Sequence, residues 1–198
     1  MTYSNKEINR LTPTNEDTVG PYYPPSLCEN NNCLDMTNIR SGIVFKPFGE
    51  KITIKGCVKD IDGKLSNGCL LEFWQPNSQG VYYRPDTESH EMVDPWFTGY
   101  ARHRTKDGNF SLTTIKPGAA DGRAPNITVT LFSDGITRLV TQLFFADEKS
   151  NSDDPLLLSI PEELRERLMI NKISDHKYEI EIIMAGKNET PFFDDLLS

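Results

Sequence analysis

The sequence predicts an all-β protein, a single β-sandwich domain with an extended N-terminal arm and one short helix near the C-terminus. Three observations support this fold class. Short runs of β-branched and aromatic residues, separated by Gly, Pro and Asp, are concentrated after residue 51. The first 50 residues are instead rich in Pro, Asn, Thr and Ser, and one segment near residue 160 has the pattern of a capped helix. The length of 198 residues suits one domain.

Residues 1–50 are expected to form the N-terminal arm and an interface segment. The run Gly20-Pro21-Tyr22-Tyr23-Pro24-Pro25 must be extended or turned, because successive prolines exclude a helix. Aromatic residues such as Tyr22 and Phe45 are apolar anchors that a merely solvating tail rarely carries. The composition therefore favours a docked arm over a disordered tail.

Residues 51–198 are expected to form the sandwich domain. Residues 52–58 alternate in polarity, Asp60-Ile61-Asp62-Gly63 indicates a turn, and residues 69–74 are again apolar, so this stretch predicts a hairpin. Further strands are expected at residues 110–114, 127–132, 139–145 and 178–184.

One helix is expected near the C-terminus. Ser159-Ile160-Pro161-Glu162 has the form of a capping box with proline in the first turn. Leu164 and Leu168 then fall on the same face of the helix. A structural role is expected for this segment.

The overall charge excludes some classes of partner. A net charge of -8 and a pI near 4.9 argue against nucleic acid and anionic membranes, which require clustered Lys and Arg. No stretch approaches the roughly 20 apolar residues of a membrane span, and the first residues lack the apolar region of a signal peptide. A cytoplasmic protein is expected.

The four cysteines predict no obvious metal or disulfide framework. Cys57 and Cys69 lie in apolar, strand-like segments and are expected in the core, where cysteine behaves as a small hydrophobe. Cys28 and Cys33 are expected to be ordinary loop cysteines, and whether they pair with each other stays open.

Short motifs follow one another in a fixed order along residues 14–195. They are Thr18-Val19-Gly20-Pro21-Tyr22, Glu72-Phe73-Trp74-Gln75-Pro76-Asn77, Gly80-Val81-Tyr82, Asp94-Pro95-Trp96-Phe97, Thr114-Ile115-Lys116-Pro117-Gly118 and Arg123-Ala124-Pro125-Asn126. In the order and spacing of these motifs the chain resembles the intradiol ring-cleavage dioxygenases. Its ending, Glu189-Thr190-Pro191-Phe192-Phe193-Asp194, is especially similar to the alpha chains of the members that cleave protocatechuate.

The resemblance implies a subunit of a heteromeric enzyme. A homologous beta subunit would hold nonheme Fe(III) with two tyrosines and two histidines, and the heterodimers would assemble into a higher hetero-oligomer. The reaction implied is O2-dependent intradiol cleavage of protocatechuate, a small aromatic substrate, to 3-carboxy-cis,cis-muconate. The alternative is a degenerate dioxygenase-fold binding or scaffold protein without catalytic activity.

The resemblance also locates the iron-site positions, which are degenerate in this chain. Tyr82 stands where the family has its first tyrosine ligand, and Ala120 where it has the second. The family's His-x-His pair, whose members share one face of a strand, is replaced by Asn126 and Thr128. The chain alone is therefore expected to bind no metal and to be inactive.

Other residues carry expectations from the same resemblance. Thr18, Gly20, Pro21 and Tyr22 would line a substrate pocket shared with the beta subunit. Arg123 stands where catalytic members use an arginine against negative charge, but without iron it is expected to serve in a surface or interface ion pair. Asp134 replaces an arginine that favours a carboxylated substrate, which leaves the substrate range open.

The three histidines offer a weaker hypothesis, an independent metal site in a stand-alone enzyme. His103 is surrounded by basic residues, His90 lies in a polar loop, and His176 is expected in a solvated turn before the last strand.

Overall fold

The computed structural model describes residues 34–37, 46–84, 91–133 and 137–193. Several residues of interest lie outside this part of the chain, namely Thr18, Gly20, Pro21, Tyr22, Cys28, Cys33, His90 and Asp134. The expectations attached to them stay predictions.

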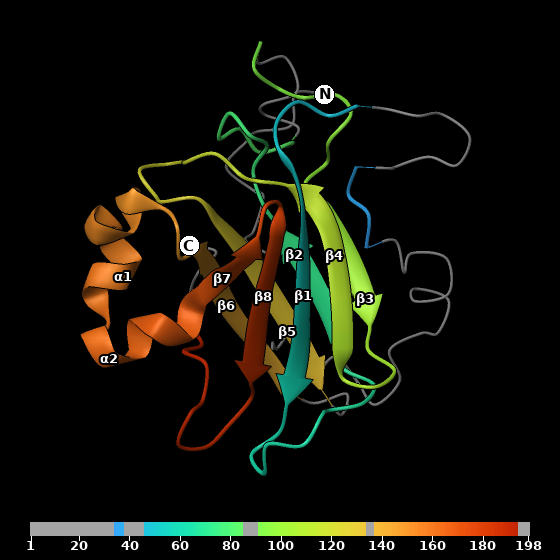
Figure 1. The fold of residues 1–198 in the computed structure, drawn as a ribbon, viewed down its shortest axis with the longest axis vertical. Coiled ribbons are helices and arrows are strands. Elements are labelled where there is room, and N and C mark those ends of the chain that lie inside the picture. Colours follow the sequence, from blue (N-terminus) through green and yellow to red (C-terminus); the bar gives the residue numbers. More distant parts are fainter. Residues whose placement is uncertain (1–33, 38–45, 85–90, 134–136, 194–198) are drawn as a thin grey trace, which may run out of the picture.

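Strands dominate the described chain, which confirms the all-β prediction (Figure 1). The strands are β1 (Lys51–Lys59), β2 (Leu70–Trp74), β3 (Tyr100–Arg104), β4 (Asn109–Ile115), β5 (Asn126–Ser133), β6 (Thr137–Phe145), β7 (Met169–Ser174) and β8 (Lys177–Ile183). The short helices are η2 (Lys149–Asp153), α1 (Pro155–Ser159), α2 (Glu162–Arg165) and η3 (Glu166–Leu168).

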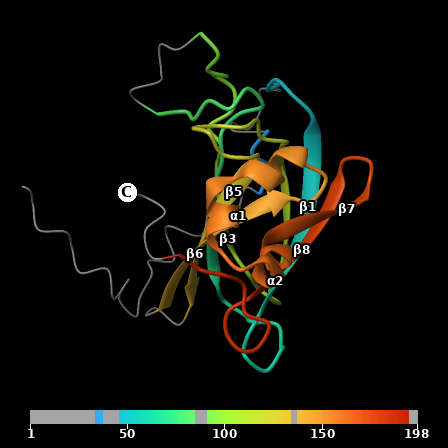
Figure 2. The same cartoon turned by 90° about the vertical axis from the view of Figure 1, so that its left-hand side faces the viewer.

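The eight strands form a folded sheet in the order β3-β2-β5-β6-β7-β8-β1-β4. Figure 2 shows two layers, with β3, β5 and β6 in one and β1, β7 and β8 in the other. The layers are joined where β6 runs parallel to β7, and that ladder has only two residue pairs, Phe144 with Met169 and Phe145 with Ile170. The sandwich is thus one continuous sheet with a narrow junction.

The core lies between the two layers. Phe73 of β2 and Phe110 of β4 approach across it with ring centroids 5.3 Å apart, and Phe145 of β6 meets Tyr178 of β8 edge-on at 5.2 Å. Aromatic pairs at such distances add to the stabilisation from apolar burial. Alternation along the strands, as in β8, places one set of side chains in this core and the other set outside.

Part of the expected arm is joined to the sandwich. Met36 is buried in the core, and its N–H donates to the carbonyl of Thr113. Residues 34–37 therefore continue the sheet beyond β4, whereas the division of the chain at residue 50 stays a prediction.

The expected hairpin between residues 52–58 and 69–74 is wrong. The turn itself is present, since the N–H of Gly63 donates to the carbonyl of Asp60. However, β1 pairs with β4 and β8, while β2 pairs with β3 and β5. The polar connection carries the chain from one layer to the other, so each strand finds its partners far along the sequence. Strands β3 and β7 were not predicted.

The helical region differs from the expectation of one helix. Two short helices flank the junction of β6 and β7 (Figures 1 and 2). The capping box does not form, because Pro161 is the N-cap of α2 and Ser159 Oγ instead donates to the carbonyl of Leu156. Leu168 is buried as expected. Within the described chain, no helix has the length and apolar character needed to cross a membrane.

Candidate functional site

The four positions expected to be degenerate iron-site positions lie at one end of the sandwich, the upper end in Figure 1, where β2 and β4 finish and β5 begins. The loop after β2 is shaped by Asn77, whose Oδ1 accepts hydrogen bonds from the N–H groups of Gln79 and Val81. This loop delivers Tyr82 onto the indole of Trp74, with stacked rings 5.6 Å apart. Tyr82 is therefore fixed against β2.

The loop after β4 packs against the Tyr82 loop. The N–H of Gly118 donates to the carbonyl of Asn77 at 2.9 Å. Gly80 has a φ of 80°, and a Cβ there would overlap the carbonyl oxygen of Ala119. Only glycine meets both requirements. The two loops are thus held in register, with Ala120 next to the Tyr82 segment.

A tight turn follows Ala120. Its N–H and carbonyl pair with those of Arg123, and the two residues between them, Asp121 and Gly122, have φ values of 52° and 73°. Positive φ at both central positions is what a type I′ turn requires, and Asp-Gly is a preferred sequence for it. The turn places Arg123 just before β5.

Strand β5 carries Asn126 and Thr128, the two positions that the resemblance matches to a histidine pair. Thr128 lies directly opposite Trp74 on β2 and Gln142 on β6, so these three side chains share one face of the sheet. Asn126 is on the same face and is only 4% exposed. Its Nδ2 donates to the carbonyl of Ala124 at 2.7 Å, whereas its buried Oδ1 has no partner among the described residues.

Arg123 forms an ion pair with the buried Asp154 of its own chain, which corrects the expectation of a surface or interface ion pair. Its Nε donates to Asp154 at 2.9 Å and its Nη2 to Gln142 at 2.8 Å. Gln142 in turn donates from Nε2 to Thr128 Oγ1 at 3.3 Å. A hydrogen-bonded chain therefore runs from Asp154 through Arg123 and Gln142 to Thr128.

The electrostatic surroundings keep Tyr82 protonated. Burial raises the pKa of the Tyr82 phenol, and the nearby carboxylate of Asp121 raises it further. The guanidinium groups of Arg123 and Arg84 oppose this shift without reversing it. The described surroundings of Tyr82 therefore favour the protonated phenol.

The residues present do not fit the family's iron. Ferric iron suits phenolate and imidazole ligands, but the four positions offer one phenol, a methyl group, an amide and a hydroxyl. In the described ranges, no group of three or more His, Cys, Asp or Glu side chains could hold a metal.

The two described histidines lie apart from this site. His103 is on the edge strand β3, and burial lowers its pKa. His176 is in the turn between β7 and β8, as expected, with a φ of 59° and a contact of 2.8 Å from Nδ1 to Glu50. They do not support an independent metal site.

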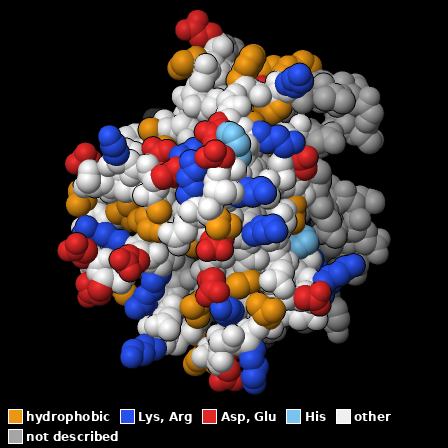
Figure 3. Space-filling model, viewed as in Figure 1, with side chains coloured by type: hydrophobic (Ala, Val, Ile, Leu, Met, Phe, Trp, Pro, Cys, Tyr) orange, Lys and Arg blue, Asp and Glu red, His pale blue; other side chains and the backbone are white. Residues whose placement is uncertain are grey.

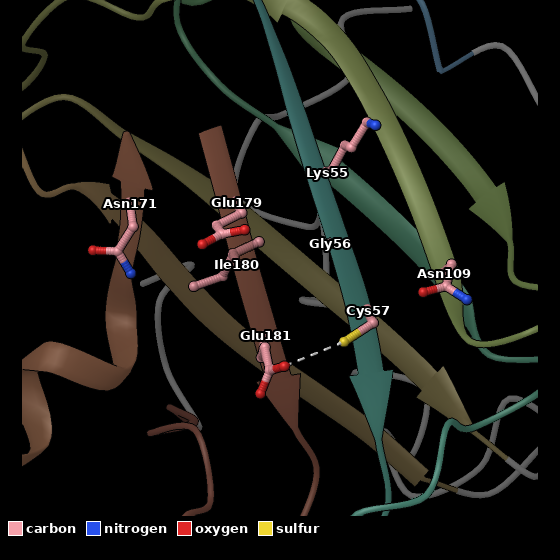
Figure 4. Close-up of a pocket in the computed structure, with 8 residues that line it drawn as sticks. All are labelled: Lys55, Gly56, Cys57, Asn109, Asn171, Glu179, Ile180 and Glu181. Atoms are coloured by element: carbon pink, nitrogen blue, oxygen red, sulfur yellow. Dashed lines mark hydrogen bonds between the residues drawn. The ribbon is translucent and has the colours of Figure 1, made fainter. Parts of the chain in front are cut away.

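A shallow hollow of about 350 Å³ lies on the outer face of β1 and β8 (Figure 4). Cys57 lines it rather than the core, which corrects the expectation for this residue, while Cys69 is fully buried as expected. Burial and the neighbouring Glu181 raise the pKa of the Cys57 thiol, which disfavours the thiolate.

Sequence reasoning missed two residues that organise the site, Gln142 and Asp154. Nothing in the sequence marks Gln142, which looks like one polar residue in an apolar strand. Asp154 did carry a signal, because an aspartate directly before Pro155 is typical of a helix N-cap followed by proline.

Comparisons of the sequence with known proteins identify a family and several relatives. The dioxygenase family model, Dioxygenase_C, matches residues 19–128. The protocatechuate 3,4-dioxygenase alpha chain of Burkholderia cepacia is 34% identical over 200 residues, covering 94% of this chain and 100% of that one. The beta chain of that enzyme, from the same organism, is 35% identical over 162 residues, covering 74% of this chain and 69% of its own length.

A solved structure with a similar fold comes from a dioxygenase as well. The dioxygenase domain of a dioxygenase and carbohydrate-binding protein fusion from Streptomyces sp. SirexAA-E superposes with a TM-score of 0.56 at 26% identity. The match covers 77% of this chain and 99% of that domain. Tyr82, Ala120 and Asn126 all fall within the range matched by the family model.

Proposed function

The chain belongs to the intradiol dioxygenase family, and from this premise we propose that it is the alpha, non-iron-binding subunit of a protocatechuate 3,4-dioxygenase. A homologous beta subunit would carry the Fe(III), and the two would together cleave protocatechuate with O2 to 3-carboxy-cis,cis-muconate. Similarity to an alpha chain over nearly the full length of both chains supports this role.

The observation that carries the proposal is the set of side chains at the expected iron-site positions. The match to a beta chain has nearly the same identity, so identity alone does not separate the two roles. The proposed alpha role is supported instead by the side chains, because Ala120 and Thr128 cannot replace a phenolate and an imidazole. The Thr128 position is moreover tied to Arg123 through Gln142, which makes it part of the folded framework.

Arg123 has a structural role in this proposal. Its guanidinium is neutralised by the buried carboxylate of Asp154, so little of its charge remains to stabilise an anion. The chemistry would therefore take place at the partner's ferric ion, which binds the hydroxyl oxygens of the aromatic ring.

In this proposal, this chain would contribute the Thr18 to Tyr22 segment to a substrate pocket shared with the beta subunit. Glycine at position 20 allows close backbone approach to a ligand, and Pro21 fixes the bend. The Thr18 hydroxyl can donate a hydrogen bond to the substrate. These properties suit a segment that closes one wall of a pocket for a small aromatic molecule.

A scaffold without catalytic activity is the second candidate. It is favoured by Ala120, Asn126, Thr128 and Asp134 together, which leave the chain without three of the four expected donors. It differs from the first candidate in requiring no iron-bearing partner.

Co-expression with the homologous chain from the same genome tests the proposal. That chain must carry two tyrosines and a His-x-His pair at the positions degenerate here. We expect the complex to consume O2 and protocatechuate and to form 3-carboxy-cis,cis-muconate, with this chain alone inactive. Cleavage by this chain alone would contradict the assignment, and an iron-bearing homologue that is fully active without it would favour the scaffold.

A further inference from the structure

The described part of the chain contains four pairs in which glycine follows an aspartate or an asparagine. They are Asp62-Gly63, Asn67-Gly68, Asp107-Gly108 and Asp121-Gly122. In such a pair the backbone nitrogen of glycine can attack the side-chain carbonyl carbon of the preceding residue, because glycine has no Cβ to obstruct the approach. Each pair is therefore chemically capable of a spontaneous rearrangement of the backbone.

Exposure alone does not select among these pairs. Figure 3 shows acidic side chains scattered among basic ones over the face formed by β8, β1 and β4, so exposed carboxylates are common on this protein. The side chains of Asp62, Asn67, Asp107 and Asp121 are all exposed as well. The pairs differ in the glycine instead, because a peptide N–H that is hydrogen-bonded or tightly packed cannot readily turn toward the neighbouring side chain.

Two of the four glycines are held by hydrogen bonds. The N–H of Gly63 donates to the carbonyl of Asp60 at 3.0 Å. The N–H of Gly68 donates to the carbonyl of Thr105 at 2.9 Å. In both pairs the attacking nitrogen would first have to give up its acceptor, so the fold opposes the rearrangement there.

Gly108 is held by packing. It is buried, and a Cβ at this position would lie 2.9 Å from the Cβ of Leu65 and 3.0 Å from the backbone nitrogen of Ser66. Its carbonyl also accepts a hydrogen bond from the N–H of Val58 at 2.7 Å. Any rotation of this peptide would displace the neighbouring segments, so packing protects the pair that Gly108 forms with Asp107.

The Asp121-Gly122 pair lacks both kinds of restraint. Both residues are exposed, and a Cβ on Gly122 would have nothing within 4 Å. Among the hydrogen bonds of the described residues, none is donated by the N–H of Gly122. The turn is closed by its outer residues, Ala120 and Arg123, whose N–H and carbonyl groups pair with each other. The peptide between Asp121 and Gly122 is therefore the least restrained of the four.

We propose that Asp121-Gly122 is a site of spontaneous aspartate isomerisation. The nitrogen of Gly122 attacks Cγ of Asp121, the hydroxyl group of the carboxyl leaves with the N–H proton as water, and a five-membered cyclic imide forms. Water then adds to the former backbone carbonyl carbon of Asp121, and the bond from that carbon to the nitrogen of Gly122 breaks. The product is isoaspartate, in which the chain runs through Cγ, the former backbone carbonyl is a free carboxylate and the composition is unchanged.

The isomerisation would disrupt the turn that precedes β5. It adds a carbon atom to the backbone within the turn, whereas a type I′ turn is closed by two residues of ordinary backbone length. The paired hydrogen bonds between Ala120 and Arg123 could not both keep their geometry. Because this turn places Arg123 for its ion pair with Asp154, the attachment of β5 to the helical region would loosen as the protein ages. This inference does not depend on the proposed function.

The first test is a time course on the purified, folded chain. The protein is incubated near neutral pH and digested, and isoaspartate is located by mass spectrometry with electron-transfer fragmentation. We expect isoaspartate to accumulate at Asp121 several times faster than at Asp62 or Asp107. In concentrated urea, where the fold no longer restrains the glycines, the three positions should react at similar rates. Equal rates in the folded chain would overturn the proposal.

The second test uses Asp121→Asn, which places two Asn-Gly pairs of identical chemistry in one chain. Asparagine accepts the φ of 52° at this position, and circular dichroism checks the fold. Loss of ammonia from either pair raises the mass of its peptide. We expect position 121 to react several times faster than Asn67 in the folded variant, and at the same rate in urea. Faster loss at Asn67 in the folded variant would overturn the proposal, and if the variant does not fold, the wild-type time course decides.

The effect on the turn has its own measurement. Aged wild-type protein should melt at a lower temperature than fresh protein, by an amount that grows with its isoaspartate content at Asp121. A melting temperature that stays constant while isoaspartate accumulates there would overturn the inferred loosening of the turn.

Discussion

Arg123 and Asp154 form a buried ion pair with two hydrogen bonds, Nε to Oδ2 at 2.9 Å and Nη2 to Oδ1 at 3.1 Å. The same carboxylate accepts from the N–H of Ala124 and, as the N-cap of α1, from those of Leu156 and Leu157. One side chain thus joins the turn before β5 to the helical region.

Replacing Asp154 with alanine should strongly destabilise the fold. The change leaves the Arg123 guanidinium uncompensated and removes the helix cap, so we expect the free energy of unfolding to fall by about 3–5 kcal/mol. Urea denaturation measures this. Asp153→Ala, at the exposed neighbouring position, should change it by no more than about 0.5 kcal/mol. Equal losses in the two variants would contradict the role of the Asp154 carboxylate.

Two glycines with similar backbone angles should respond differently to alanine. Gly80 has a φ of 80° and a Cβ there would overlap Ala119, whereas Gly122 has a φ of 73° and open space around it. Gly122→Ala should cost about 1 kcal/mol from backbone strain alone, and Gly80→Ala clearly more because the two loops must separate. Thermal melting of both variants tests the difference, and similar melting temperatures would refute the packing of Gly80 against Ala119.

The phenol of Tyr82 should titrate above the ordinary tyrosine range. Burial, with Asp121 in support, raises its pKa, so the folded state holds the proton more tightly than the unfolded state. Its contribution to stability is therefore complete below the ordinary pKa and is lost as pH rises through the higher, folded value. Ultraviolet titration of the wild type against Tyr82→Phe isolates this group.

The cause of that shift can be tested separately. Asp121→Asn should lower the pKa of Tyr82, and asparagine tolerates the positive φ at this turn position. Asp107→Asn, at an exposed residue of another turn, is the control and should leave it unchanged. An unchanged titration in both variants would rule out Asp121 as a contributor.

The lone chain should purify without stoichiometric iron and without visible tyrosinate absorption after addition of ferric salt. A variant with Ala120→Tyr, Asn126→His and Thr128→His should gain iron and colour, because it restores the missing donor types. Elemental analysis and visible spectroscopy decide between these outcomes. One tightly bound iron per wild-type chain would overturn the degenerate-site assignment, and a folded triple variant without iron would show that missing donors are not the cause.

Much of the sandwich could be predicted because its strands are regular and apolar. Strand β5, for example, is almost entirely buried and has the β-branched composition that marks such strands. Strand β3 escaped prediction because Arg102, His103 and Arg104 give it a polar sequence, as an edge strand allows. The hairpin prediction was wrong because a turn signal fixes local geometry but does not reveal which strands pair across the fold.

The candidate site was predictable only in part. The motif order located Tyr82, Ala120, Asn126 and Thr128, and the structure gathers them at one end of the sandwich. The motif order could not reveal that Gln142 bridges Thr128 to Arg123, because Gln142 belongs to none of the motifs. Hydrogen-bond networks of this kind depend on register, which a single sequence specifies poorly.

The order of the folded sheet also bears on how the protein avoids aggregation. Beyond β4 the sheet is continued by residues 34–37, so β3 is the exposed end of the order within the described chain. An unfolded or foreign strand that tried to extend the sheet there would lie beside the charged side chains of Arg102 and Arg104. The polar sequence of β3 would thus disfavour strand-to-strand polymerisation in a concentrated solution of the protein.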